Sequence, residues 1–169
     1  DTGTVRAMLE RYEVVHEGPR ALLLERRAAP LQTRFRTIGE TVAGWEEPFT
    51  PPKAGAGETI WASFEIVPSP WGRLRWFFFR TDPPLIQADF ADGQSHWLRL
   101  LREIALEPLP VTPLPRNLAE AALYLRNQPL PAGAEAVRLM FRTNGREQYR
   151  PQIRVRWYAA SRGQARGQA

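Results

Sequence analysis

The amino-acid sequence predicts an all-β fold: an antiparallel β-sandwich of jelly-roll type, with a short N-terminal helix–hairpin element and one crossover helix. Sixteen prolines and twelve glycines disfavour a helical bundle, whereas a sandwich needs a turn roughly every 8–12 residues. About eight strand-like runs follow residue 31, which is the number typical of a two-sheet jelly roll. A single helical pattern interrupts these runs, although a parallel α/β fold would need a helix between most of its strands.

The N-terminal residues 1–27 are predicted to form a unit somewhat separate from the rest. Residues 4–12 show the apolar spacing of one helix face and predict a short helix. Its apolar positions are Val5, Met8, Leu9 and Tyr12. Two apolar runs around a Gly-Pro turn predict a β-hairpin over residues 13–25. Residues 28–30 then serve as a linker.

Residues 31–159 are predicted to form the sandwich. Its strands are expected at 33–41, 59–67, 73–80, 85–90, 96–106, 137–142 and 153–158. Four prolines within residues 108–115 predict an extended crossover instead of a central strand. Asn117 followed by Glu120 resembles a capping box and predicts a helix over residues 117–126. The small and polar residues 160–169 are predicted to be a disordered tail.

Groups that could perform catalysis or bind a metal are scarce. The chain has no cysteine, which excludes disulfides, thiolate zinc sites and cysteine nucleophiles. Ser95 and His96 are neighbours on a predicted strand and point to opposite faces, and His16 lies far away in the chain. A solvated turn explains the acidic residues near one turn better than a structural calcium ion does; these are Asp82, Asp89 and Asp92. We predict no catalytic residue, no metal site and no cofactor.

Six tryptophans are the first feature that points to a ligand. Trp71 falls in a Pro-Ser-Pro-Trp-Gly turn, where a core position is hard to reach. Trp61 and Trp97 lie on strand faces opposite to the apolar ones. Exposed aromatic rings on a rigid β-scaffold stack on the apolar face of a sugar ring. These three tryptophans, with Arg73 as a hydrogen-bond donor, are candidate carbohydrate-binding residues; the alternative is that they fill the core or pack against the N-terminal unit.

The abundance of arginine is the second feature that points to a ligand. The net charge is +5 and Lys53 is the single lysine, so nearly all the positive charge is guanidinium. If the last two strands pair, four guanidiniums share one face and form an anion-binding surface; these are Arg138, Arg142, Arg154 and Arg156. Lipid headgroups or lipid-linked phosphates would suit this surface, and a solvated basic face is the alternative. No nucleic-acid-binding module is recognisable, so no nucleic-acid partner is expected.

The N-terminal unit also carries a family resemblance. The run Leu-Glu-Arg-Tyr-Glu-Val-Val-His at 9–16, then Gly18 and Leu-Leu-Leu-Glu-Arg-Arg at 22–27, resembles the extracytoplasmic C-terminal segment of bacterial multi-pass membrane glycosyltransferase-like proteins. A β-sandwich sometimes follows that segment. The resemblance implies a place on the periplasmic or extracellular face of a bacterial membrane and a supporting role. The family's catalytic carboxylates lie in loops of its membrane part, so no catalytic residue carries over.

Two functions therefore compete. The first is a non-catalytic module that binds carbohydrate or a lipid-linked sugar beside a membrane glycosyltransferase-like protein. The second is a structural or protein-interaction module that docks on the membrane domain of the same polypeptide or complex, without a small ligand. Exposed tryptophans in a concave groove would favour the first function, whereas a flat apolar patch or buried tryptophans would favour the second. A buried carboxylate pair in a cleft would instead point to an enzyme.

Overall fold

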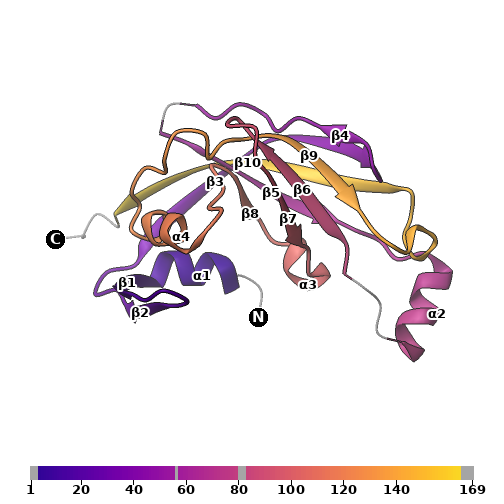
Figure 1. Cartoon of the computed structure of the whole chain (residues 1–169), viewed down its shortest axis with the longest axis horizontal. Helices are drawn as coiled ribbons and strands as arrows, with labels where there is room; N and C mark the ends of the chain where they lie inside the picture. The colour runs from indigo at the N-terminus through magenta and orange to yellow at the C-terminus, as the bar shows by residue number, and fades with distance from the viewer. Residues whose placement is uncertain (1–3, 56, 80–82, 165–169) are drawn as a thin grey trace.

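Two four-stranded antiparallel sheets, stacked face to face, make up most of the molecule (Figure 1). The computed structural model describes residues 4–55, 57–79 and 83–164. The first sheet has the order β3-β10-β5-β8, with bounds Leu31–Gly44, Gln152–Gln164, Thr59–Glu65 and Leu109–Thr112. The second has the order β4-β9-β6-β7, with bounds Pro48–Phe49, Ala136–Arg142, Leu85–Phe90 and Ser95–Arg99. The mainly antiparallel sheet structure is as predicted and is that of a sandwich, and its jelly-roll topology stays a prediction.

The main core lies between the two sheets because alternate residues of each strand point inward. In β6, every second residue is buried, namely Ile86, Ala88 and Phe90. Phe64 of β5 meets Phe141 of β9 edge to face, with ring centroids 5.5 Å apart. This contact joins the two sheets, so the apolar face that the sequence pattern indicates is the face that becomes the core.

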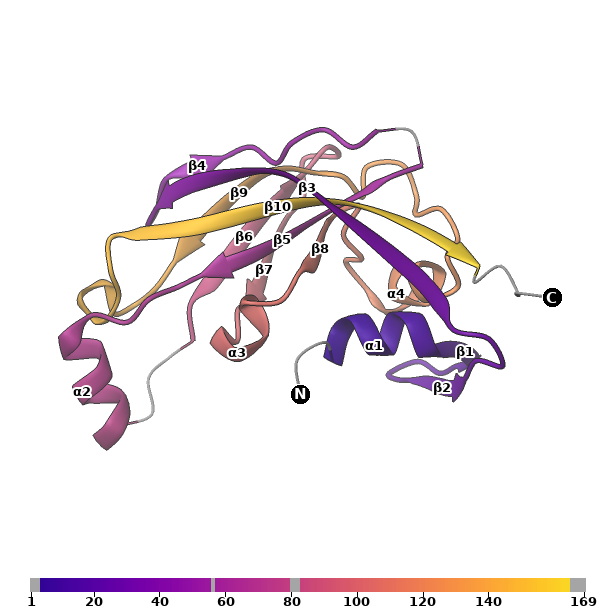
Figure 2. The ribbon, with the colours of Figure 1, turned by 180° about the vertical axis from the view of Figure 1, so that it is seen from behind.

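A second, smaller core lies where β3 and β10 continue past the sandwich. In both Figure 1 and Figure 2, helix α1, the hairpin β1–β2 and helix α4 gather beside these long strands. Their bounds are Thr4–Arg11, Tyr12–Glu17, Leu22–Arg26 and Leu118–Leu125. The buried side chains of this second core are Leu9, Val14, Trp61, Ala122, Tyr124, Leu125 and Ala160. The N-terminal helix and hairpin form where the sequence predicts them, and Asn117 caps α4 by accepting a hydrogen bond from the N–H of Glu120.

Strand β10 is longer than its sequence indicates. It pairs with β3 from Gln152 to Gln164, so the prediction of a disordered tail from residue 160 is wrong for residues 160–164. The reason is tertiary: Ala160 is small enough to pack into the second core, and β3 offers a complete hydrogen-bonding edge. Residues 165–169 lie outside the described residues.

The predicted strand at 73–80 is wrong, because helix α2 spans Pro70–Phe78. Ser69 is its N-cap, with the side-chain oxygen accepting from the N–H of Gly72 at 3.0 Å. Pro70 at the first helical position has its φ already set for a helix. A run of four aromatic residues looks like a buried strand in the sequence, but the local capping signal decides the conformation here.

The predicted strand at 96–106 is wrong in its second half. Strand β7 ends at Arg99, and a short helix, α3, follows at Arg102–Ala105. Strand β8 then takes the edge position of the first sheet, where a proline such as Pro110 can be accommodated. A single 3₁₀ turn, η1 (Arg146–Gln148), follows β9 and packs against α2.

Candidate functional site

The outer face of the second sheet carries an exposed tryptophan beside an arginine. Trp97 of β7 and Arg142 of β9 point outward because their neighbours Leu98 and Phe141 pack on the core. The guanidinium carbon of Arg142 lies 4.9 Å from the centroid of the Trp97 ring, within the range of a cation–π contact. Trp97 still exposes 46% of its surface. The structure thus joins two residues that the sequence assigned to different sites.

A shallow pocket of about 300 Å³ surrounds this pair and is called here the Trp97 pocket. Its lining residues are Pro83, Leu85, Trp97, Arg142, Thr143 and Asn144. The hydroxyl of Thr143 accepts a hydrogen bond from the N–H of Gly145 at 3.2 Å, which orders the turn that carries the rim. An apolar floor with a few guanidinium, hydroxyl and amide groups is the composition that fits a sugar ring.

Helix α2 presents the largest concentration of exposed apolar side chains in the described chain. It projects from the end of the molecule opposite to the hairpin (Figure 1). The exposed residues are Trp71, Leu74, Trp76, Phe77, Phe78 and Phe79, and Phe77 exposes 79% of its surface. Contiguous exposed apolar surface of this kind marks an interaction site.

The first turn of α2 is fixed firmly to the sandwich. The hydroxyl of Ser69 donates to the carbonyl of Glu147 at 2.6 Å, and the N–H of Ser69 donates to the carbonyl of Gln148 at 2.9 Å. Gly72 is buried against Gln148, where a Cβ atom would lie 1.8 Å from the carbonyl oxygen. Only a glycine allows this approach, so the helix is held to the rest of the molecule at its base.

The predicted carbohydrate-binding residues do not form one site. Trp71 is exposed as expected, but it lies in α2 and not in a turn, and Arg73 is exposed on the same helix. Trp97 lies on the second sheet, and neither α2 residue lines its pocket. The prediction that Trp61 is exposed is wrong: its side chain is fully buried, contacts Phe35 edge to face at 5.1 Å and donates from Nε1 to the hydroxyl of Thr59. The outward face of β5 is covered by the second core, which the sequence pattern of one strand does not reveal.

The predicted four-arginine face is also wrong, because β9 and β10 belong to different sheets. Cross-strand carboxylates pair with three of the four guanidiniums: Arg138 with Asp89 at 2.6 Å, Arg154 with Glu65 at 3.2 Å, and Arg156 with Glu40 at 2.7 Å. The fourth, Arg142, lies over Trp97. Exposed ion pairs of this kind contribute modest stability and leave little free charge for a separate anion.

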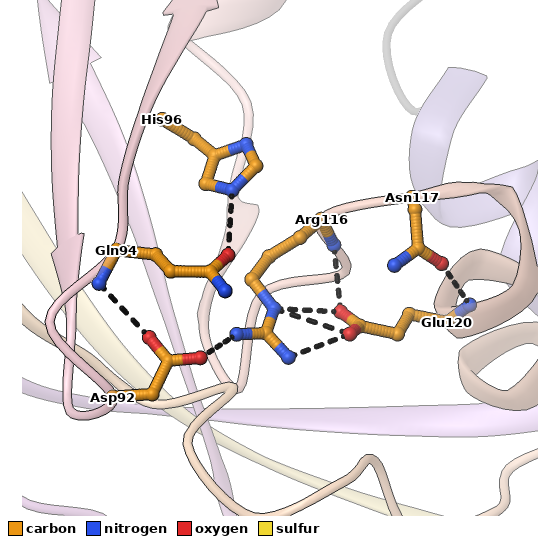
Figure 3. A network of polar contacts seen from close by, with 6 residues as sticks. All are labelled: Asp92, Gln94, His96, Arg116, Asn117 and Glu120. Atoms are coloured by element: carbon orange, nitrogen blue, oxygen red, sulfur yellow. Dashed lines mark hydrogen bonds and ion pairs between the residues drawn. The ribbon is translucent and has the colours of Figure 1, made fainter.

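A polar network connects the β6–β7 turn to the start of α4 (Figure 3). Arg116, whose side chain is only 9% exposed, pairs with Glu120 at 2.7 Å and with Asp92. Hydrogen bonds from Arg116 lower the pKa of Glu120. The N–H of Gln94 and then Arg116 lower the pKa of Asp92. Both carboxylates are therefore stabilised in the ionised form, which suits a structural clamp and not a general acid at neutral pH.

The described residues hold no group of three or more histidine, cysteine, aspartate or glutamate side chains placed to bind a metal ion. His96 lies edge to face with Phe90 at 5.5 Å. Within the same residues, no helix has the length and apolar character needed to cross a membrane. Asp82, one of the three acidic residues considered for calcium, lies outside them.

Comparison of the chain with protein-family models, with curated proteins and with solved structures gives no match. The Trp97 pocket and the exposed apolar surface of α2 are the two features of the described chain that point to a function.

Proposed function

We propose that this chain is a non-catalytic extracytoplasmic β-sandwich module, of jelly-roll type, that binds a glycan or lipid-linked sugar in the Trp97 pocket. It would act on the periplasmic or extracellular face of a bacterial membrane, attached to a membrane glycosyltransferase-like protein. The observation that supports it is the half-exposed Trp97 ring, held by Arg142 at 4.9 Å inside a pocket with a polar rim. Trp97 belongs to a strand that is paired with β6 over Ser95–Arg99, which limits the ordering cost of binding.

The pocket offers complementary chemistry to a pyranose. The open part of the Trp97 ring provides a flat apolar surface for the C–H face of a sugar. Arg142 and Asn144 provide hydrogen-bond donors at the rim. On the same outer face, Arg138 forms an ion pair with Asp89, whereas Arg142 lies over the ring of Trp97. A guanidinium in this position favours sugars that carry a carboxylate or phosphate, because such groups accept two of its N–H donors at once.

The test is calorimetric titration of the purified chain with bacterial glycans and polyprenyl-phosphate sugars. We expect a saturable response that Trp97→Ala weakens roughly two- to tenfold, since stacking on an aromatic ring contributes roughly 0.5–1.5 kcal/mol. Trp71→Ala is the matched control, because Trp71 is exposed to a similar degree, 53%, on another element. Absence of any response across the panel, or equal loss in both variants, would reject the Trp97 pocket as the sugar site.

The second candidate function is a structural or protein-interaction module. The exposed apolar surface of α2 and the burial of Trp61 favour it, because a contiguous exposed apolar patch is typical of a docking surface. Capture of the membrane domain of the same polypeptide by the wild-type chain, and not by Phe77→Ser/Phe78→Ser, would support this function when no sugar binds.

A further inference from the structure

Most of the apolar side chains of helix α2 lie on one side of the helix. With 3.6 residues per turn, four apolar side chains cover an arc of about 120°. They are Phe77, Leu74, Phe78 and Trp71, and they are called here the α2 apolar arc. Gly72 lies almost diametrically opposite to the centre of this arc on the same helical wheel. Because Gly72 is the residue buried against the sandwich, the α2 apolar arc points away from the domain.

One arginine flanks each side of the arc. Arg73 follows next to Phe77 on the wheel, and Arg75 follows next to Trp71. Both are exposed, and Arg75 makes one long contact, 3.9 Å, with Glu147. Long basic side chains at the borders of an apolar stripe can lay their stems along the apolar surface while the charge reaches outward.

Further arginines, which carry positive charge like Arg73 and Arg75, lie around the base of α2. The segment Pro70–Phe78 contains no acidic residue. Arg146, in the 3₁₀ turn that packs on α2, and Arg150, whose N–H bonds to the carbonyl of Val67 just before the helix, are both exposed. This end of the molecule therefore joins aromatic side chains with several guanidiniums, and among the described residues of α2 and η1 Glu147 is the one carboxylate.

We propose that α2 is a membrane-interface helix that inserts its apolar arc into the headgroup region of a bilayer containing anionic lipids. Tryptophan, phenylalanine and leucine on one face with arginine at the borders is the composition of helices that lie in this interface. The nine residues of α2 extend for only about 14 Å, a length that suits lying along the surface. The sandwich provides the rigid mount, through Ser69 and Gly72, that a free peptide lacks.

The lipid surface is preferred to a protein groove because of charge. A groove on a protein would need acidic groups on both of its rims to match Arg73 and Arg75, whereas an anionic leaflet presents phosphates on every side of an inserted helix. Each arginine near such a surface strengthens binding by roughly fivefold. The proposal does not depend on carbohydrate binding, since vesicles without sugar test it.

The experiment is co-sedimentation of the whole chain with vesicles of phosphatidylcholine alone and of phosphatidylcholine mixed with phosphatidylglycerol. We expect binding to the mixed vesicles, a blue shift of tryptophan fluorescence, and weaker binding at high salt or without the anionic lipid. Phe77→Ser/Phe78→Ser should lower the partition coefficient at least about tenfold. Arg73→Gln/Arg75→Gln should lower it only for the anionic vesicles.

A matched control uses exposed apolar residues on other elements. Leu23 and Val42 both expose 61% of their surface, so Leu23→Ser/Val42→Ser should bind vesicles as the wild type does. Equal binding of the wild type and Phe77→Ser/Phe78→Ser would overturn the proposal, and so would no binding to either vesicle. Self-association of the wild type that Phe77→Ser/Phe78→Ser abolishes, without vesicle binding, would assign α2 to an interface between copies and reject the lipid surface.

Discussion

Aromatic side chains are buried at one end of the molecule and exposed at the other. At the hairpin end, Trp61 and Tyr124 are buried, and Phe35 packs edge to face on Trp61. At the α2 end, Phe77 and Phe78 expose 79% and 65% of their surfaces. Both ends rise from the same sandwich, in which β3 and β10 form the longest ladder.

The difference lies in what covers each end. Helices α1 and α4 and the hairpin close over the extension of β3 and β10, so its apolar side chains form a second core. Helix α2 packs on the 3₁₀ turn η1 through its first turn, and the described chain places no further layer over its apolar arc. Identical residue types thus stabilise the fold at one end and remain available for binding at the other.

The largest expected effect comes from truncating an aromatic residue at the covered end. Trp61→Ala should lower the free energy of unfolding by about 3–5 kcal/mol, because it empties a fully buried site and removes the contact with Phe35. Urea unfolding followed by circular dichroism measures it. At the open end, Phe77→Ala should change stability by less than about 0.5 kcal/mol. Similar losses in the two variants would show that the ends do not differ as described.

A smaller effect is expected from breaking the mount of α2. Gly72→Ala places a Cβ atom 1.8 Å from the carbonyl oxygen of Gln148, so the helix must shift or unwind, at a cost of about 1–3 kcal/mol. The second core should be unaffected, which hydrogen exchange at α4 would report. Gly39→Ala is the matched control, since nothing lies within 4 Å of its added Cβ. Normal stability and vesicle binding in Gly72→Ala would contradict the proposed mount.

The smallest expected effect concerns the charged clamp between the β6–β7 turn and α4. Bonds from Arg116 lower the pKa of Glu120 in the folded state. The unfolded state therefore takes up protons first as the pH falls, and stability present above about pH 4.5, the ordinary pKa of glutamic acid, is lost on acidification. As the pH is lowered from about 5 through 4.5 and below, wild-type unfolding midpoints should fall by more than those of Glu120→Gln. If the unfolding midpoints of the two proteins change with pH in parallel, Glu120 does not contribute to the loss of stability in acid.

Much of the architecture follows from local sequence patterns. Alternation places Ile86, Ala88 and Phe90 on one face of β6, and this face is buried. Asn117 and Ser69 are capping residues whose side chains accept hydrogen bonds three residues on, and both signals can be recognised in the sequence. The aromatic run after residue 75 favours a strand, whereas Ser69 followed by Pro70 begins the helix that forms there. Local capping geometry is a better guide there than side-chain type.

The candidate sites depend on contacts that no single segment contains. Trp97 and Arg142 meet across β6, since they belong to β7 and β9 and lie far apart in the chain. Nothing in either strand alone indicates this pair. The partners of Arg154 and Arg156 are likewise set by the strands on either side of β10, which bring Glu65 and Glu40 beside them. For this reason Arg154 and Arg156 form ion pairs and not the expected anion-binding face.

The sequence by itself determined the β-rich class, the N-terminal helix and hairpin, the capped helix α4 and the aromatic and arginine-rich composition of α2. These depend on periodicity, turn residues and caps, which act within a few residues. Tertiary structure decided which aromatic residues are exposed. Either face of a strand can carry apolar residues, and Trp61 is buried because α1, the hairpin and α4 pack over one end of the sheet. The close approach of Gly72 to Gln148 directs the α2 apolar arc outward. Burial is a property of layers, and no local pattern encodes which layer will cover a given face.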